Sequence, residues 1–330
     1  MSKEKTLTAK NNASTTKDKI ANFWNDTKKD FRINRSLYLL VLPVVAYYII
    51  FMYVPMSGIL MAFQNFTYNI KYNFFGNLIH SEFVGLDQFK SLFGSLYFKR
   101  ALGNTLRISI ASILIEFPAP IILALLLNEI KSKNFKKLTQ TTSYLPHFIS
   151  MVVVCGMVKD FTTDTGIVST LISYITGKPA ETMLNNPKLF LPVYIGSNLW
   201  QEIGWGSIIY IAALSGIDQA LYEAAAIDGA GRWKQMIHVT LPGILPTIVI
   251  MLILRMGSIL NVSFEKILLL SNELTWKTSE VLSTLVYRRG LINMEWSFSV
   301  AANLFNSVVN FALLTLVNYI SRKTSETSLW

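Results

Sequence analysis

The sequence has very little cysteine and few charged residues for its length. Of its 330 residues only one, Cys155, is cysteine, which excludes an intrachain disulfide and any metal site built from cysteines. Cys155 lies in an apolar run, where we expect it to act as a small buried hydrophobe. Charged residues make up 15% of the chain and apolar residues 52%. Because the apolar residues come in long runs, the composition excludes an ordinary soluble protein and predicts an integral membrane protein.

The sequence also lacks the common motifs of enzyme active sites. It contains no GxxxxGK[ST] loop to hold ATP phosphates, and no GxSxG, HExxH or GxGxxG. Its three histidines, His80, His147 and His238, fall in different segments and suggest no shared metal site. We therefore expect no catalytic residue, no metal ion and no cofactor bound by this chain itself.

Six apolar segments follow a polar, basic N-terminal tail. The tail, residues 1–36, has no signal-peptide pattern, and a short interfacial helix is predicted near residues 20–31. The apolar segments cover approximately residues 37–63, 105–128, 142–158, 189–214, 243–270 and 298–320. A transmembrane helix needs roughly 20 apolar residues, which the third segment nearly reaches and the others exceed. The sequence therefore predicts an all-α membrane protein with six transmembrane helices.

Lysine and arginine are distributed unevenly between the loops. If the N-terminus is cytoplasmic, the tail, residues 129–141, the loop after the fourth segment and the C-terminus together hold 17 of the 30 basic residues. The longer loops on the other side hold fewer. The positive-inside rule therefore places both termini in the cytoplasm. The net charge of +10 follows this topology, so we expect no nucleic-acid partner.

The loop between the fourth and fifth segments contains EAAAIDGAGRWKQMIHVTLP, residues 223–242. Asp218 can cap a first short helix, and Gly229 can end it in the left-handed conformation. A second short helix follows, which Pro242 is expected to stop before the next apolar segment begins. Small side chains between the two helices would let another surface approach closely. We also expect Glu223, Asp228 and Arg232 to fix the bend by pairing with each other.

This stretch resembles the EAA loop of binding-protein-dependent ABC importer permeases. The pattern of that family is EAA, three residues, G, nine residues, I, one residue, LP. It is matched here by Glu223, Ala224, Ala225, Gly229, Leu241 and Pro242, with Val239 in place of isoleucine. The phrases FVGLDQF, FPAPIILALLLNEI, SYLPHFIS, ILNVSFEKILLL and YRRGL are similar to the subgroup that serves oligo- and polysaccharides. The alternative interpretation of the loop is an ordinary amphipathic connector.

The resemblance implies the ABC transmembrane type-1 fold and a permease subunit that forms half of a translocation path. It implies that a partner ATPase, which binds ATP and Mg, contacts the loop at Glu223, Ala224, Ala225, Asp228, Gly229, Ala230, Leu241 and Pro242. The other implied partners are a second homologous permease, a second ATPase copy, an extracytoplasmic solute-binding protein, a saccharide and the lipid of the bacterial cell membrane. The expected parts are a basic tail (1–36), the first helix with its outer loop (37–104), the core (105–320, with the EAA-like loop at 221–242) and a cytoplasmic C-terminus (321–330).

Glu116, Glu202 and Arg255 are charged residues that lie within the apolar segments. They can snorkel or pair structurally, or they can belong to a functional path. Glu116 and Arg255 each lie about 12 residues from the inner end of their segments, which at 1.5 Å per residue is a similar depth. We therefore expect these two residues to pair across the bundle interior, or both to line a wet cavity.

Aromatic and polar residues near Glu202 suggest a route for sugars, which need both apolar faces and hydrogen-bonding edges. The candidates for a substrate path are Asn198, Trp200, Gln201, Glu202, Tyr210 and Asn261. Ordinary helix packing of the aromatic residues is the alternative. A different solute, such as a peptide or phosphate, would keep the same fold. An ion-coupled secondary transporter would need inverted repeats and broken helices in matching halves, which the sequence does not display.

Overall fold

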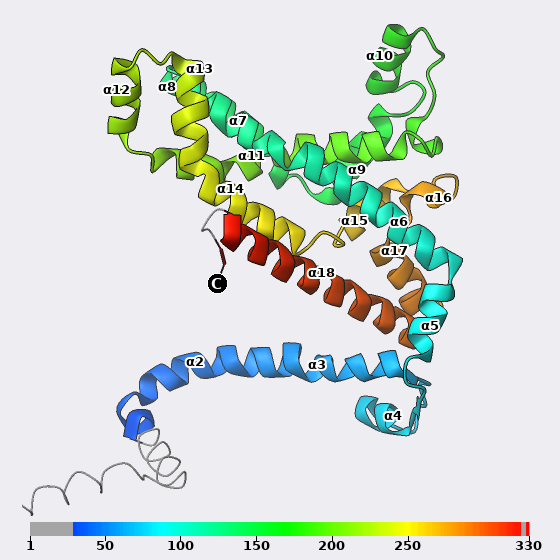
Figure 1. The fold of residues 1–330 in the computed structure, drawn as a ribbon. Helices are drawn as coiled ribbons and strands as arrows, with labels where there is room; N and C mark the ends of the chain where they lie inside the picture. The colour runs from blue at the N-terminus through cyan, green and yellow to red at the C-terminus, as the bar shows by residue number, and fades with distance from the viewer. Residues whose placement is uncertain (1–28, 325–327, 330) are drawn as a thin grey trace, which may run out of the picture. The chain divides into compact units, whose positions relative to one another are not determined.

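The computed structural model describes residues 29–324 and 328–329, and it is mostly helical (Figure 1). The interfacial helix predicted near residues 20–31 lies largely outside the described residues. The chain forms two compact units, residues 1–59 and residues 60–330.

The first unit contains one long apolar helix. It begins with α2 (Arg35–Tyr48), passes through a π-helical turn (Ile49–Tyr53) into α3 (Val54–Met56), and continues as a 3-10 segment (Ser57–Phe63) that leads into the second unit. Its large apolar side chains are exposed along nearly the whole length. A helix that presents apolar side chains all round is typical of a membrane span in contact with lipid.

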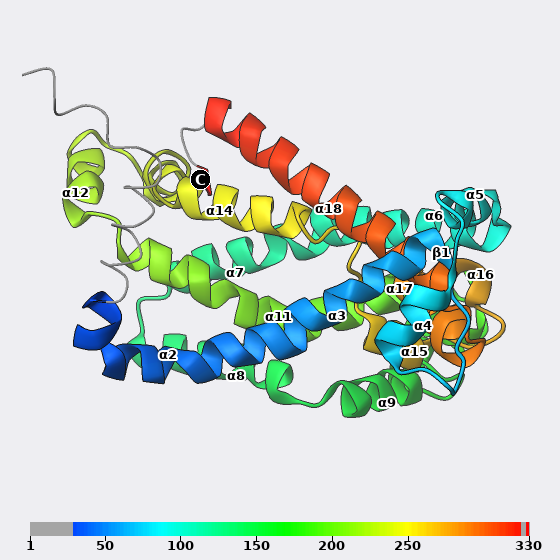
Figure 2. The ribbon, with the colours of Figure 1, turned by 90° about the horizontal axis from the view of Figure 1, so that it is seen from below.

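The second unit begins with a short antiparallel pair, β1 (Gln64–Asn65) and β2 (Glu82–Phe83), in which Gln64 pairs with Phe83. Helix α4 (Phe74–His80) lies between the two strands in sequence. The remaining helices are α5 (Asp87–Gly94), α6 (Leu96–Ala111), α7 (Pro118–Glu129), α8 (Lys133–Tyr144), α9 (Met151–Phe161), α10 (Ile167–Thr176), α11 (Phe190–Ser215), α12 (Gln219–Ile227), α13 (Arg232–Gln235), α14 (Leu241–Met256), α15 (Phe264–Leu270), α16 (Trp276–Ser279), α17 (Leu282–Val286) and α18 (Trp296–Thr324). Short π-helical or 3-10 segments join several of them: η3 (Ser112–Glu116), η4 (Leu145–Phe148), η5 (Met183–Asn185), η6 (Met236–Thr240) and η7 (Tyr287–Ile292). Within this unit α12 lies at one end, and α5 and α16 lie at the other (Figures 1 and 2).

Several helical stretches are long and apolar enough to cross a membrane. In the part of the chain that the structure describes there are four: Arg35–Phe63, Leu96–Glu129, Arg232–Met256 and Trp296–Thr324. A fifth is counted if the bent pair Lys133–Phe148 and Met151–Phe161 forms one span. Helix α11 is 26 residues long but is not one of these stretches. The chain is therefore a multi-pass membrane protein, and six spans remain a prediction.

The structure corrects three boundaries predicted from the sequence. The third apolar segment is not one helix, because the chain bends by 98° between η4 and α9. The fifth segment ends at Met256, and α15 is a separate helix. Pro242 does not stop the preceding helix, since the helical stretch Arg232–Met256 continues through it. Pro242 lies inside this continuous helix, directly after the π-helical turn η6 and in the first turn of α14.

Three buried apolar clusters hold the second unit together. One joins Ile108, Phe190 and Ile267, another joins Leu92, Phe98 and Leu285, and the third joins Ile121, Tyr210 and Ile244. Helix α11 contributes to the first and the third of these clusters and so extends between them.

Helices α8 and α11 approach each other very closely at one glycine. A Cβ atom on Gly204 would lie 2.0 Å from the carbonyl oxygen of Ser143. The absence of a side chain at Gly204 therefore sets the distance between the two helices and the position of the polar residues of α11.

Candidate functional site

The EAA-like loop (residues 221–242) forms two helices joined by a glycine turn. The Asp218 side chain accepts a hydrogen bond from the Ala220 N–H at 2.9 Å and so caps α12. At the other end Gly229 has φ +77°, in the left-handed region that favours glycine. The Ala230 N–H donates to the Ala225 carbonyl at 2.9 Å, and the Gly229 N–H donates to the next carbonyl along the helix. These two bonds form a Schellman motif, which satisfies the free carbonyls at the end of the helix.

Side chains attach the second helix to the first. The Tyr222 and Thr240 hydroxyls lie 3.0 Å apart and join α12 to η6, and Gln235 Nε2 donates to the Ala230 carbonyl at 2.9 Å. The predicted pairing of Glu223, Asp228 and Arg232 was wrong, because no ion pair joins any two of these described residues. The backbone bonds of the glycine turn fix the bend instead.

The EAA-like loop presents apolar side chains on a polar segment. Of the eight residues predicted to contact a partner, Glu223, Ala224, Asp228, Gly229, Leu241 and Pro242 are exposed, and Ala225 and Ala230 are half-buried. Beside them Ile227 is 86% exposed and Trp233 is 71% exposed. Large apolar side chains clustered on an exposed loop are typical of a protein-binding surface.

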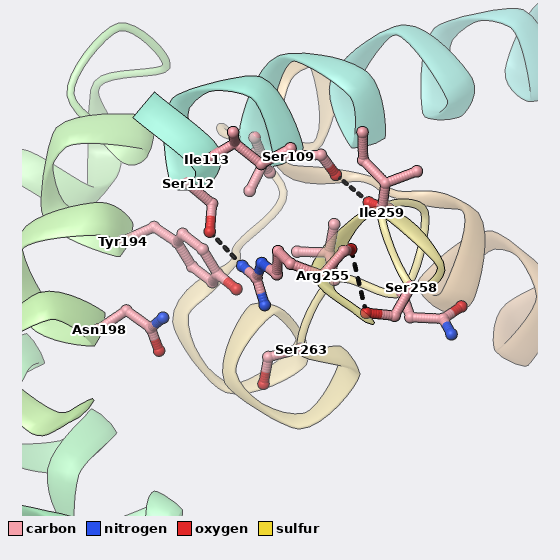
Figure 3. Close-up of a pocket in the computed structure, with 12 residues that line it drawn as sticks. Ser109, Ser112, Ile113, Tyr194, Asn198, Arg255, Ser258, Ile259 and Ser263 are labelled. Atoms are coloured by element: carbon pink, nitrogen blue, oxygen red, sulfur yellow. Dashed lines mark hydrogen bonds between the residues drawn. The ribbon is translucent and has the colours of Figure 1, made fainter. Parts of the chain in front are cut away.

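Two adjoining cavities, together called the central cavity here, lie among η3, α11 and the end of α14. Their volumes are about 200 Å³ and about 560 Å³. Both are lined by Asn198, Arg255, Ser258 and Ser263, so the two cavities meet at these side chains. The central cavity is lined mainly by polar side chains at the end nearer Ser109 and Tyr194 (Figure 3).

Arg255 and Glu116 face each other in the wall of the central cavity. Their nearest side-chain N and O atoms are 3.5 Å apart. The Ser112 hydroxyl lies between them and donates to Glu116 Oε2. It accepts a hydrogen bond from the Arg255 guanidinium (Figure 3). The Arg255 side chain is 44% exposed and that of Glu116 only 11%. The carboxylate is thus part of the wall, while the guanidinium also faces the cavity.

A second charged group, the Glu202 carboxylate, also belongs to the cavity wall. His147, at the break between α8 and α9, places Nδ1 2.9 Å from Glu202 Oε2. The His147 ring stacks on Trp205, with ring centroids 4.4 Å apart and planes 3° apart. Glu202 and Trp205 line the larger of the two cavities, so this contact attaches the bend in the chain to the cavity wall.

Lys266 is a fully buried cation behind this wall. Its Nζ lies 3.3 Å from Asn198 Oδ1 and 3.4 Å from Gln201 Oε1. A lysine ammonium can only donate, so both amide oxygens must face it. The Asn198 NH₂ group then points away from Lys266, and Gln201 Nε2 donates to the Ile149 carbonyl at 3.5 Å.

The six residues predicted for a substrate path separate into two groups. Asn198, Glu202, Tyr210 and Asn261 line the central cavity. Trp200 instead lines a separate apolar cavity of about 490 Å³ beside α9 and α10, and Gln201 is 3% exposed.

The sequence reading missed other residues of the central cavity. Ser112, Tyr194, Ser258 and Ser263 line it, with His147 and Lys266 against its wall. Lys266 could have been found, because it is a charge inside an apolar run. The serines carry no comparable signal. The cavity as a whole offers hydroxyl, amide, guanidinium, carboxylate and aromatic groups, which together can bind a polar molecule that also has apolar faces.

Comparison with known proteins gives one consistent result. Residues 116–326 match the family described as binding-protein-dependent transport system inner membrane component. The chain is 42% identical to the protein LplB of Bacillus subtilis over 298 residues, which is 90% of this chain and 92% of LplB. It is 41% identical over 297 residues to the polygalacturonan/rhamnogalacturonan transport system permease protein YteP of the same organism, covering 90% of each. Among solved structures, it matches a chain of a bacterial alginate ABC transporter in complex with an alginate pentasaccharide-bound periplasmic protein. The TM-score is 0.82 and the identity 41%, with coverage of 93% of this chain and 99% of that one.

Proposed function

This chain belongs to the family of binding-protein-dependent transport system inner membrane components, and from that premise we propose that it is a permease subunit of an ABC importer for an oligosaccharide or polysaccharide fragment. The observation that carries the proposal is the fold match at 41% identity over 93% of the chain to an alginate transporter. The polygalacturonan/rhamnogalacturonan permease, at the same identity, supports the same class of cargo. The chain forms part of the translocation path, and it does not itself catalyse a reaction.

The energy for transport comes from partner ATPase subunits, which bind ATP and Mg. The surface for this partner is the EAA-like loop, which offers a rigid glycine turn and exposed apolar side chains such as Ile227 and Trp233. A groove on the ATPase that takes up these side chains would move α12 and the helix formed by α13 and η6 as one body, because Tyr222 of α12 and Thr240 of η6 join them. This end of the second unit is cytoplasmic, in agreement with the distribution of lysine and arginine.

The saccharide passes through the central cavity. Hydroxyl groups of a sugar can pair with Asn198, Ser258 and Arg255, while the indole of Trp205 offers an apolar face. A single chain supplies half of the path, and a second homologous permease supplies the other half. An extracytoplasmic solute-binding protein delivers the cargo at the end of the unit opposite α12. The complex lies in the bacterial cell membrane and works by alternating access.

Reconstitution tests this function directly. The full chain is co-expressed with the ATPase, second permease and binding protein encoded beside it, and the complex is placed in proteoliposomes. ATP hydrolysis is expected to rise when binding protein loaded with oligogalacturonides or with neutral galacto-oligosaccharides is added outside. A chain that purifies without an ATPase, or a complex whose hydrolysis ignores every loaded binding protein, contradicts the proposal.

A further inference from the structure

A second polar hollow lies at the end of the unit opposite the EAA-like loop, between α6, α16 and η7. Its volume is about 540 Å³, and its lining includes Arg100, Arg288, Arg289, Tyr97, Trp276 and Glu295. We call it the arginine hollow. Concave sites of this size are typical for small ligands, whereas a protein partner usually docks on a flatter surface.

The charges of the arginine hollow do not cancel. The Glu280 side chain, only 2% exposed, accepts hydrogen bonds from Arg100 at 2.9 Å and from Arg288. Glu295 pairs with Arg289. Three guanidinium groups thus face two carboxylates, which leaves one positive charge. Glu280 is buried beneath Arg100 and Arg288, so its negative charge is not exposed at the surface of the hollow. That surface is therefore more positive than the net charge of one suggests.

The guanidinium groups are held in place and keep donors to spare. Arg100 lies over the Tyr97 ring, Arg288 over the Trp276 ring and Arg289 over the ring of Phe298, at 5.4, 5.1 and 3.9 Å from the ring centroids. Stacking of this kind fixes the plane of a guanidinium. Each arginine has five N–H donors, and the carboxylates occupy only some of them. Arg100 Nε is buried and has no hydrogen-bond partner.

Crowding of like charges makes an anion favourable here. Burial lowers the pKa of Arg288, and the neighbouring positive charge of Arg100 lowers it further. Arg288 remains protonated near neutral pH in spite of this lowered pKa. The lowered pKa means that its charged form would be stabilised by a further negative charge nearby. Two N–H groups of a guanidinium held in a fixed plane can donate two parallel hydrogen bonds to the two oxygens of a carboxylate.

We propose that the arginine hollow binds the carboxylate of an acidic saccharide at the outer end of the permease, before the chain of sugars reaches the central cavity. This inference rests on the proposed function for the direction of transport and for the saccharide class. It adds a second binding site to the permease. Arg100 of this site and Ser112 of the central cavity are 12 residues apart along one helix, which at 1.5 Å per residue is about 18 Å.

The test is direct binding to the purified full chain in detergent, measured by saturation-transfer NMR. The probes are trigalacturonate, its fully methyl-esterified form, which keeps the sugars and removes the charges, and a glutamate-rich peptide. Trigalacturonate is expected to bind the unaltered chain at least about fivefold more tightly than the ester, since one charge contact in a water-exposed site has about that effect. Equal binding of the two saccharides, no binding of either, or binding of the peptide alone overturns the proposal.

Two substitutions separate recognition of charge from support of the fold. Arg289→Gln and Glu295→Gln break the same ion pair, but they change the charge of the hollow in opposite directions. Arg289→Gln is expected to weaken trigalacturonate binding about fivefold, and Glu295→Gln is expected to strengthen it, with the ester unaffected by either. Shifts in the same direction for both variants would assign the ion pair a structural role only and would overturn the inference.

This outcome is distinguishable from failure of the proposed function. The binding assay needs neither the ATPase nor the binding protein. If the reconstituted complex couples hydrolysis to a loaded binding protein while the hollow does not select the acid, the inference fails and the function stands. If the hollow selects the acid but no complex couples, the function fails.

Discussion

The Arg255 guanidinium lies 3.5 Å from the Glu116 carboxylate, and the Ser112 hydroxyl bridges them. The two charged residues are separated by more than a hundred positions in sequence and join η3 to α14 inside the bundle. Arg255 is the more exposed partner and also lines the central cavity. One contact therefore both supports the packing of the helices and shapes the wall of the proposed path.

A double-mutant cycle with Glu116→Gln and Arg255→Gln measures this coupling. Each single substitution leaves an unpaired charge in the bundle, so each is expected to lower the yield of the assembled complex strongly. The double variant is expected to lose less than the sum of the two, with an interaction energy of about 0.5–3 kcal/mol. Complex yield and thermal unfolding in detergent are the measurements.

The exposed pair of Lys90 and Asp87 provides the control for this cycle. Its side chains are 77% and 63% exposed, so its coupling is expected to be within about 1 kcal/mol of zero. If the losses caused by Glu116→Gln and Arg255→Gln are strictly additive, the interaction energy of this pair is no larger than that of the control pair. That result would contradict a stabilising contact between Glu116 and Arg255.

Local signals in the sequence were sufficient for the EAA-like loop. The cap by Asp218 and the break at Gly229 depend on neighbouring residues only, and the structure has both. The pairing of Glu223 with Asp228 and Arg232 was wrong, because exposed charges gain too little to fix a turn that the backbone bonds already hold.

Predictions about the central cavity depended on which face of α11 each residue occupies. Asn198 and Glu202 are four positions apart and share a face, whereas Trp200 lies two positions from each and points to the other side. Helical spacing alone could therefore have removed Trp200 from the set. The bend at His147 and the amide partners of Lys266 could not be predicted, since they depend on contacts between distant helices.

The close approach of α8 and α11 predicts a sharp difference between two glycines of α11. Gly204→Ala is expected to destabilise the chain by about 1–3 kcal/mol, because the new methyl group would lie 2.0 Å from the Ser143 carbonyl oxygen. At Gly196 a Cβ meets nothing within 4 Å, so Gly196→Ala serves as the matched control. Thermal unfolding of the two purified variants is the measurement, and equal midpoints would contradict the close packing at Gly204.

The topology is testable with two single cysteines in a Cys155→Ala background. Lys178 and Arg232 are both exposed, and they lie on opposite sides of the membrane if the positive-inside rule holds. An impermeant thiol reagent added to intact cells is expected to label Lys178→Cys and not Arg232→Cys. Both should react after the membrane is permeabilised, which shows that each thiol is accessible. Labelling of Arg232→Cys alone in intact cells would reverse the orientation.

The glycine turn of the EAA-like loop gives the most specific prediction about coupling. Gly229 has φ +77°, and a β-branched residue there costs about 1–3 kcal/mol of backbone strain. Gly229→Val is therefore expected to insert into the membrane normally but to distort the bend between α12 and α13, so that ATP hydrolysis no longer responds to loaded binding protein. Gly229→Asn should recover most of the response, because asparagine tolerates the left-handed conformation.

Gly231→Val is the matched control, since Gly231 has an ordinary φ of −67° and open space around it. Full coupling in Gly229→Val would show that the turn does not transmit the motion, and equal damage from Gly231→Val would show that bulk in the loop, not the backbone conformation of Gly229, is what the partner rejects.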